Sequence, residues 1–463
     1  MTSRRQILAL PLTLAGTSLL TACASGSFMN DPHPPIVFVH GNGDTAALWQ
    51  TTVWRFESNG WPRERLHAID LPYPTARAED NKPEPGRTST AEHMAYLRSE
   101  VDKVLQATGA RQVVLIGNSR GGYAIRNYIQ NGGGARKVSH AILGGVPNHG
   151  VWNIPGRAPD SEFAGNGPFL QALNKPKNAN GDEVTGPVKW LTIRSDNNDK
   201  YAQPKGRWIG DPKTDTGIGF DAPALKGATN VVIPRIDHRE TSFSPAAFEA
   251  AYRFITGKAP AHLDIVPEDP VVLSGKVTGL GVSSTDPASG NFANNLPLPG
   301  AKVEIFAIDP TSGARRGNAA YSQVVGADGR WGPFTGRPDT RYEFVVEAPG
   351  YATTHVYRSP FPRSSSVVHL RPERLPEFDK PGPTVVIFTR PRGYFDADRD
   401  QMLFDRRRPP PLVVQGTGAG VSASRIKPEE VHRPVMGEFN GEKVVGQTWP
   451  TASNEVTVLE LTY

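Results

Sequence analysis

The chain has 463 residues, a length that exceeds one compact core and predicts two or three domains. Its 38% hydrophobic content suffices for globular folding, and 47 glycines with 43 prolines exclude a helical bundle and favour a loop-rich protein that contains strands. The net charge of +5 is a weak basic bias, and no run of Lys and Arg interleaved with aromatic residues indicates nucleic-acid binding.

Residues 1–22 have the pattern of an export signal. Arg4 and Arg5 precede an apolar stretch, residues 7–20, that is too short to span a membrane comfortably. The arginine pair resembles a twin-arginine signal, which directs export after folding. The LTAC sequence that ends in Cys23 resembles a bacterial lipobox, in which the cysteine becomes the lipid-modified first residue. The alternative is an ordinary cleaved signal with a chance cysteine. We therefore expect export, either as a periplasmic, outer-membrane or cell-surface lipoprotein attached to the bacterial membrane through Cys23, or as a secreted protein.

After a linker over residues 23–33, residues 34–258 alternate between predicted strands and helices. Largely apolar runs, typical of strands in a buried parallel sheet, are PIVFVHG (35–41), LHAIDL (66–71), VVLIG (113–117), VSHAILG (138–144) and VKWLTI (188–193). Helices are predicted from a capping box at Ser89 and Glu92 to Gly109, from about Arg120 to Ile129, and from Pro245 to Thr256. The alternation predicts an α/β fold with a doubly wound, mostly parallel sheet.

Residues 146–187, which are rich in Gly, Pro and Asn with a few apolar residues, are predicted to form a long excursion after a strand. An excursion of this length after a strand is typical of a lid or of a wall of a substrate pocket. The alternative is a disordered surface insertion.

Residues 259–463 have an all-β pattern. VVLSGKVTGLG (271–281), AKVEIFAID (301–309) and YEFVVEA (342–348) are short strand runs joined by turns of Pro, Gly and Asp. Residues 297–351 resemble the small transthyretin-like or carboxypeptidase-regulatory-like β-sandwiches found on secreted enzymes, so we expect a β-sandwich-like domain over residues 259–372. Residues 373–463 supply further strands that complete or extend this region.

The GNSRG sequence at residues 117–121 has the spacing of a nucleophile elbow. A strand precedes it and a helix follows it, and the small residues Gly117 and Gly121 allow the sharp turn that exposes the hydroxyl of Ser119. The alternative is an ordinary serine in a glycine-rich loop. An oxyanion would need two backbone donors. We expect these to be the N–H groups of Arg120 and of Asn42, in the HGNG loop after the first strand, where His40 has a structural role.

The base and the acid should follow the nucleophile in chain order. His238 lies shortly before the last predicted helix, where the base is expected, and no other histidine is so placed. Two aspartates follow the strand at 188–193, and either could orient the imidazole. Asp199 is preferred over Asp196 because it keeps the usual distance of a few residues to the following Pro204. Asp237, next to the base, should point away from it.

HGNG, GNSRGG, GGVPNHG, SDNND and DHRE, in this order, resemble an α/β-hydrolase of the bacterial lipase and esterase kind. The added β region resembles that of two-domain lipases, in which it contributes to lipid binding. The resemblance implies a serine hydrolase that cleaves carboxylic esters through an acyl-enzyme, with no cofactor or metal. Its substrate would be a lipid, another hydrophobic ester or a polyester. A serine amidase or peptidase on the same scaffold and a non-catalytic lipid- or envelope-binding lipoprotein are the alternatives.

Overall fold

The computed structural model describes Met1 and residues 33–206, 208, 211–410 and 421–463. The predicted signal sequence, Cys23 and nearly all of the predicted linker lie outside the described residues. None of the helices in the described ranges is both long enough and apolar enough to cross a membrane.

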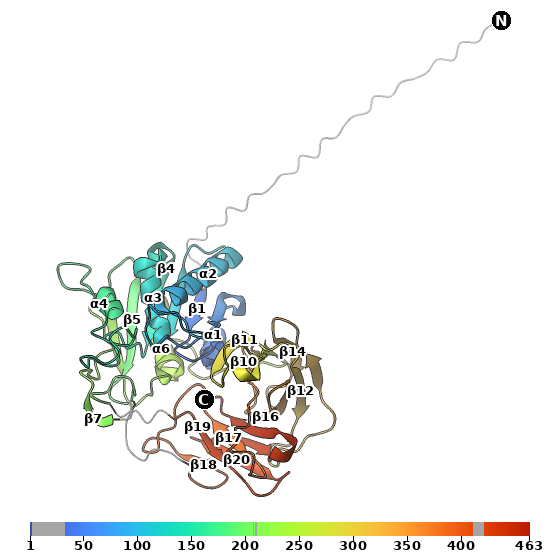
Figure 1. Ribbon diagram of the computed structural model, residues 1–463. Helices are drawn as coiled ribbons and strands as arrows, with labels where there is room; N and C mark the ends of the chain where they lie inside the picture. The colour runs from blue at the N-terminus through green and yellow to red at the C-terminus, as the bar shows by residue number, and fades with distance from the viewer. Residues whose placement is uncertain (2–32, 207, 209–210, 411–420) are drawn as a thin grey trace. The chain divides into compact units, whose positions relative to one another are not determined.

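A six-stranded parallel sheet forms the centre of the N-terminal half (Figure 1). Its strand order is β2-β1-β3-β4-β5-β8. The strands are β1 (Ile36–Val39), β2 (Leu66–Ile69), β3 (Val113–Asn118), β4 (Val138–Gly144), β5 (Lys189–Ser195) and β8 (Thr229–Ile233). The parallel sheet with its helices confirms the predicted α/β fold class. Strand β8 was not predicted, because its TNVVI sequence is mixed and half exposed at the edge of the sheet.

Helices cover both faces of this sheet. They are α1 (Gln50–Ser58), α2 (Thr90–Thr108), α3 (Arg120–Asn131), α4 (Pro168–Leu173), α5 (Glu240–Phe243) and α6 (Pro245–Thr256). Alternate residues of β1 point to opposite faces. Val37 packs with apolar residues of α2 and α3, whereas Phe38 packs with those of α1 and α6. The predicted capping box at Ser89 begins α2, and Gly109 ends it with a φ of 67°.

The C-terminal half is built of β-strands. A seven-stranded sheet has the order β13-β12-β15-β16-β22-β17-β19. Its strands are β12 (Lys302–Ala307), β13 (Tyr321–Val324), β15 (Tyr342–Glu347), β16 (Thr353–Arg358), β17 (Val386–Thr389), β19 (Ala423–Ile426) and β22 (Glu455–Glu460). Shorter sheets contain β9 (Val271–Lys276) with β14 (Arg330–Gly336), β10 (Thr278–Leu280) with β11 (Ala293–Pro297), and β18 (Met402–Phe404) with β20 (Pro434–Phe439) and β21 (Glu442–Gln447). The large sheet therefore joins strands from before and after residue 373.

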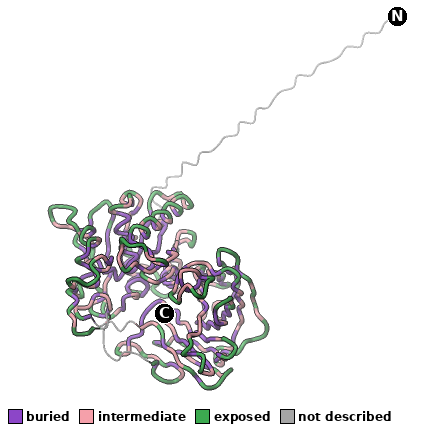
Figure 2. Tube along the Cα trace, viewed as in Figure 1, coloured by how far each residue is buried: buried purple, intermediate pink, exposed green. Residues whose placement is uncertain are grey.

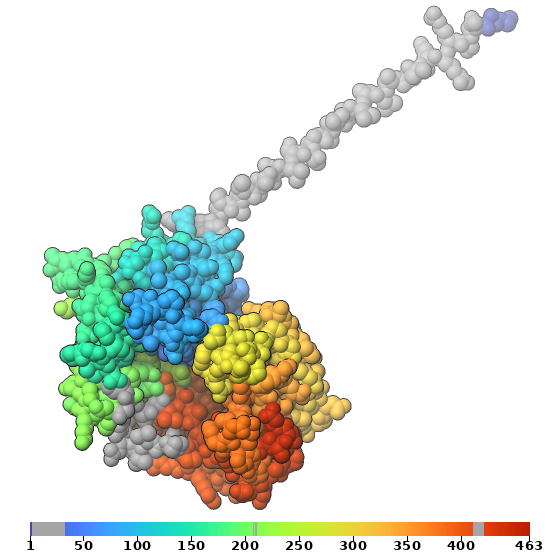
Figure 3. Space-filling view, viewed as in Figure 1, coloured from blue at the N-terminus to red at the C-terminus, as the bar shows by residue number. Residues whose placement is uncertain are grey.

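The two halves are packed together, and residues 33–463 form one compact unit. Trp54 of α1 belongs to the apolar core of the β region, and its indole Nε1 donates a hydrogen bond to the carbonyl of Ser364 at 2.8 Å. Buried segments run through both halves (Figure 2). The β10–β11 hairpin, yellow in Figure 3, lies against the blue N-terminal segment, where Asn295 Nδ2 donates to the carbonyl of Asp44 at 2.8 Å.

Candidate active site

Ser119 lies in a sharp turn between β3 and α3. Its φ of 52° and ψ of −126° form a backbone conformation that residues other than glycine rarely adopt. Glycines make this turn possible. A Cβ on Gly121 would lie 2.4 Å from the carbonyl oxygen of Val39, and one on Gly41 would lie 3.0 Å from the Cβ of Ser119. The local structure is therefore that of a strained strand-to-helix elbow.

His238 is buried, and its imidazole contacts one carboxylate. Its Nδ1 lies 2.8 Å from Oδ1 and 2.9 Å from Oδ2 of Asp199. Asp196 does not share this contact, since its Oδ1 accepts hydrogen bonds from the backbone N–H groups of Asn197 at 2.7 Å and Arg235 at 3.0 Å. A carboxylate at Nδ1 leaves Nε2 as the atom that exchanges a proton.

The serine and the histidine line the same cavity, which has a volume of about 330 Å³. Asn118, next to Ser119, donates from Nδ2 to the carbonyl of His238 at 3.2 Å and so ties the two loops together. Tyr201 packs edge-on against the imidazole with a centroid distance of 4.5 Å. The remaining lining residues are mostly apolar or aromatic; those from residues 146–187 are Pro147, Val151, Trp152 and Phe163.

The HGNG loop is held in place by hydrogen bonds between its own side chains and nearby backbone groups. His40 Nδ1 lies 2.9 Å from the carbonyl of Gly41, and Nε2 accepts from the N–H of Leu71 at 3.1 Å. Burial lowers the pKa of His40, so the ring is neutral and structural. Asn42 lines the cavity, and its Oδ1 accepts from the N–H of Ala76 at 2.7 Å. Arg120 is the first residue of α3, where backbone N–H groups have no partner within the helix.

Two segments of the chain match models of known families. Residues 33–152, which contain the HGNG loop and Ser119, match the family Lipase (class 2). Residues 269–375, in the β region, match the Lipase C-terminal domain. The chain is thus similar to class 2 lipases over the first segment and to the lipase C-terminal domain over the second, and neither match covers half of the chain. This combination confirms the predicted resemblance to two-domain lipases.

Several solved structures are similar to this chain. The propeptide form of Bacillus licheniformis lipase BlEst2 is 17% identical, with a TM-score of 0.37, and the match covers 61% of this chain and 59% of that one. Aspergillus fumigatus lipase B is 14% identical, with a TM-score of 0.35 and coverage of 52% and 56%. The match therefore spans a little over half the length of both. Bacillus subtilis carboxylesterase CesB is 14% identical, with a TM-score of 0.29 and coverage of 50% and 86%.

Several residues that line the cavity have no assigned role in the sequence analysis, among them Asp44, Arg239, Tyr201, Trp208 and Tyr394. Asp44 and Arg239 line the cavity as an ion pair, with 3.1 Å between Oδ2 and Nε. Tyr201 comes from the loop after Asp199, and Tyr394 comes from the β region. Tyr394 could not be recognised as a site residue from its place in the sequence, because no motif connects it with the elbow at Ser119.

The side chain of Arg120 has a structural role that was also missed. It forms a buried, bidentate ion pair with Glu162, with Nε–Oε1 and Nη2–Oε2 distances of 2.7 and 2.8 Å. Burial raises the pKa of Glu162, and Arg120 opposes this effect. The pair anchors the segment 146–187 to the residue that follows the elbow serine.

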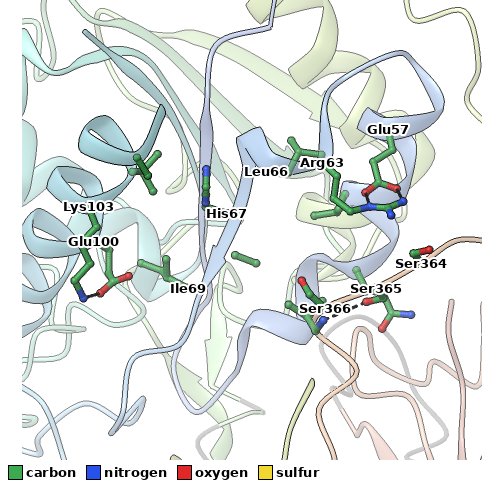
Figure 4. Close-up of a pocket in the computed structure, with 16 residues that line it drawn as sticks. Glu57, Arg63, Leu66, His67, Ile69, Glu100, Lys103, Ser364, Ser365 and Ser366 are labelled. Atoms are coloured by element: carbon green, nitrogen blue, oxygen red, sulfur yellow. Dashed lines mark hydrogen bonds and ion pairs between the residues drawn. The ribbon is translucent and has the colours of Figure 1, made fainter. Parts of the chain in front are cut away.

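A second cavity of about 330 Å³ lies between β2, α2 and residues 364–367 (Figure 4). His67 on β2 and Ser364–Ser366 both line it, but no hydrogen bond joins them in Figure 4. The hydroxyl oxygens of Ser364 and Ser365 instead accept hydrogen bonds from the backbone N–H groups of Val272 and Val367. The serine and histidine of this cavity are therefore not arranged as a nucleophile and its base.

Proposed function

We propose that the protein is a serine carboxylic-ester hydrolase that acts through an acyl-enzyme. One observation carries the proposal: Ser119, in a strained elbow, lines the same cavity as a histidine whose Nδ1 lies 2.8 Å from a buried carboxylate. In this proposal Ser119 is the nucleophile, His238 the general base and Asp199 the acid that orients the imidazole and stabilises its cation.

The proposed reaction has two halves. In the first, His238 Nε2 takes the proton of Ser119 as its Oγ attacks the ester carbonyl carbon, and the N–H groups of Asn42 and Arg120 stabilise the oxyanion. The tetrahedral intermediate collapses as His238 returns the proton to the leaving alcohol, which leaves an acyl-enzyme. In the second half, His238 deprotonates a water molecule that attacks this acyl group. The second tetrahedral intermediate then collapses as His238 returns the proton to Ser119 Oγ, which releases the carboxylic acid and restores the free enzyme.

The lining of the cavity supports a hydrophobic ester as the substrate. Trp152, Phe163, Tyr201 and Trp208 offer aromatic surface beside the serine. The volume of about 330 Å³ lies at the lower end of the range for small-molecule sites. We propose that a short acyl or aromatic group of a lipid, another hydrophobic ester or a polyester binds next to Ser119, while longer parts of the substrate extend out of the cavity.

The test is hydrolysis of p-nitrophenyl esters of increasing acyl length by the wild type and by Ser119→Ala. Loss of the nucleophile should lower kcat by about a million-fold. The rate that remains is the small acceleration that substrate binding and the oxyanion hole provide without the serine. The control is Ser366→Ala. Ser366 lines the second cavity, so this substitution should leave kcat unchanged. Wild-type protein that hydrolyses none of these esters, or Ser119→Ala protein that keeps full activity, would contradict the proposal.

A further inference from the structure

A residue of the C-terminal β region reaches into the candidate active site. Tyr394 follows β17 in the chain and lines the same cavity as Ser119 and His238. It is 8% exposed, so its ring is part of the wall rather than a side chain in solvent. The β region therefore forms part of the boundary of the site.

The backbone of Tyr394 is fixed to the residue before the histidine. Asp237 Oδ2 accepts hydrogen bonds from the N–H of Tyr394 and from Nη1 of Arg390, both at 2.8 Å. The same Nη1 donates to the carbonyl of Tyr394 at 2.7 Å. Because Asp237 immediately precedes His238, the histidine loop and the tyrosine share one set of hydrogen bonds.

A second carboxylate strengthens this attachment. Glu240 contacts Arg390 through Oε1 and Arg399 through Oε2, at 2.6 Å in each case. Asp237 and Glu240 belong to the N-terminal α/β half, residues 34–258, whereas both arginines belong to the β region, residues 259–463. The buried guanidinium of Arg390 thus bridges two carboxylates, with Nη1 on Asp237 and Nη2 on Glu240, and charged hydrogen bonds of this kind are stronger than neutral ones. The two halves are therefore joined next to the candidate base.

The Tyr394 ring is held by its neighbours as well. Lys200 Nζ and Arg239 Cζ lie 4.0 and 4.9 Å from its centroid, within cation–π range. Burial raises the pKa of Tyr201, and a side-chain hydrogen bond with Tyr394 acts in the opposite direction. Tyr201 also packs on His238. Tyr394, Tyr201 and the imidazole therefore form one continuous part of the cavity wall.

We propose that Tyr394 is a specificity-determining residue of the ester hydrolase, and that Arg390 is a positioning residue that fixes Tyr394 to the His238 loop. The proposal rests on the proposed function, because it concerns the same cavity. The ring takes up space that a longer or bulkier part of the ester would need. The β region thus contributes directly to the selection of substrate.

The test uses the full chain and compares substrates within each variant. The ratio of kcat/KM for p-nitrophenyl octanoate over p-nitrophenyl butyrate varies the acyl part, and the ratio for benzyl over ethyl butyrate varies the alcohol. Such ratios do not depend on the fraction of active protein. Tyr394→Ala should raise at least one ratio by about tenfold, which is the effect of opening an apolar pocket by a few atoms. Tyr394→Phe keeps the ring and should keep both ratios within about twofold.

The role of Arg390 is tested by Arg390→Gln. This variant should shift whichever ratio Tyr394→Ala raises, in the same direction but by a smaller factor. Arg390→Lys, which keeps one positive charge, should restore part of the wild-type ratio and serves if the glutamine variant does not fold. The control is Arg363→Gln. Arg363 also joins the halves, through ion pairs with Glu57 and Glu268 at 2.9 and 3.0 Å, but lines neither the cavity nor the His238 loop. It should leave both ratios unchanged.

Two outcomes would overturn the inference. Unchanged ratios in both substrate series for Tyr394→Ala would remove the specificity role, and equal shifts in Arg390→Gln and Arg363→Gln would show general loosening rather than positioning. Ser119→Ala separates these outcomes from failure of the proposed function. If that variant is inactive while the Tyr394→Ala ratios do not change, the hydrolase proposal stands and only this inference fails.

Discussion

The backbone of Ser119 is strained, and its surroundings compensate for the strain. A conformation of this kind costs on the order of 1–3 kcal/mol and persists only when neighbouring structure enforces it. Here the buried strand β3 on one side and the buried helix α3 on the other fix the turn. A Cβ on Gly117 would lie 2.6 Å from Ile125 Cδ1, so the glycines are needed for the close packing of strand and helix.

The two aspartates after β5 give a prediction about single carboxylates. Asp199→Asn should lower kcat by about 10⁴-fold, because an amide does not stabilise the imidazolium and favours the wrong tautomer. Asp196→Asn is the matched control and should stay within a few-fold of wild type, since Asp196 binds backbone N–H groups of its own loop. Kinetics with a p-nitrophenyl ester measure both. The reverse order of effects would transfer the proposed role of the acid to Asp196.

Among single residues, the sequence predicts those candidate site residues that are marked by a motif or by their position next to a predicted element. Ser119 has a motif, and His238 has a position before the last helix. The acid was narrowed to two aspartates, and only the packing of their loop distinguishes which one contacts the imidazole. Tyr394 could not be predicted, because its place in the wall depends on how the two halves pack, and hydrophobic periodicity does not encode that packing.

Among the elements, the loop after β2 is tied to the β region by a charged cluster. Asp70 Oδ2 lies 2.7 Å from His369 Nε2 and 3.5 Å from Lys276 Nζ. Burial opposes ionisation of Asp70, but His369 and Lys276 outweigh it and hold the pKa of this carboxyl well below its ordinary value. A carboxylate whose pKa is lower in the folded state stabilises the fold at neutral pH.

This cluster predicts how stability depends on pH. The contribution of Asp70 is complete above its unfolded pKa of about 3.9 and is lost as the pH falls through the lower folded value. Asp70→Asn should therefore reduce the free energy of unfolding by about 3 kcal/mol near pH 7, and the difference from wild type should shrink in acid. Urea unfolding across pH measures this. Asp339→Asn, at an exposed ion pair, is the control and should cost less than about 1 kcal/mol at any pH. Parallel pH curves for wild type and Asp70→Asn would contradict the assignment.

The elements that the sequence predicts well are those whose burial is uniform. Strands β1 and β3 are buried along their whole length and appear as unbroken apolar runs. Strand β8 lies at the edge of the sheet next to β5 and is partly exposed, so its sequence has no such run. In the β region the short strands were expected, but their order in the large sheet depends on long-range pairing that no local pattern specifies.

For the whole molecule, the packing of the two halves goes beyond surface contact. Trp54 of α1 is buried in the core of the β region, so removal of that region would expose it. Loss of this burial alone amounts to roughly 3 kcal/mol, a large part of the 5–15 kcal/mol that stabilises a typical domain. The charged pairs at Asp237, Glu240 and Asp70 would lose their arginine, histidine and lysine partners at the same time.

We therefore predict that residues 33–463 unfold as one cooperative unit. Calorimetry should show a single transition, and it should coincide with the loss of the proposed esterase activity and with the change in tryptophan fluorescence. A fragment of residues 33–258 should be much less stable than the full chain or should aggregate, because Trp54 and neighbouring apolar surface become exposed. Two separate transitions, with activity that survives the first, would instead mean that the lipase-like half folds independently. In that case the β region would be an attached module, and the charged pairs at the His238 loop would contribute little to stability.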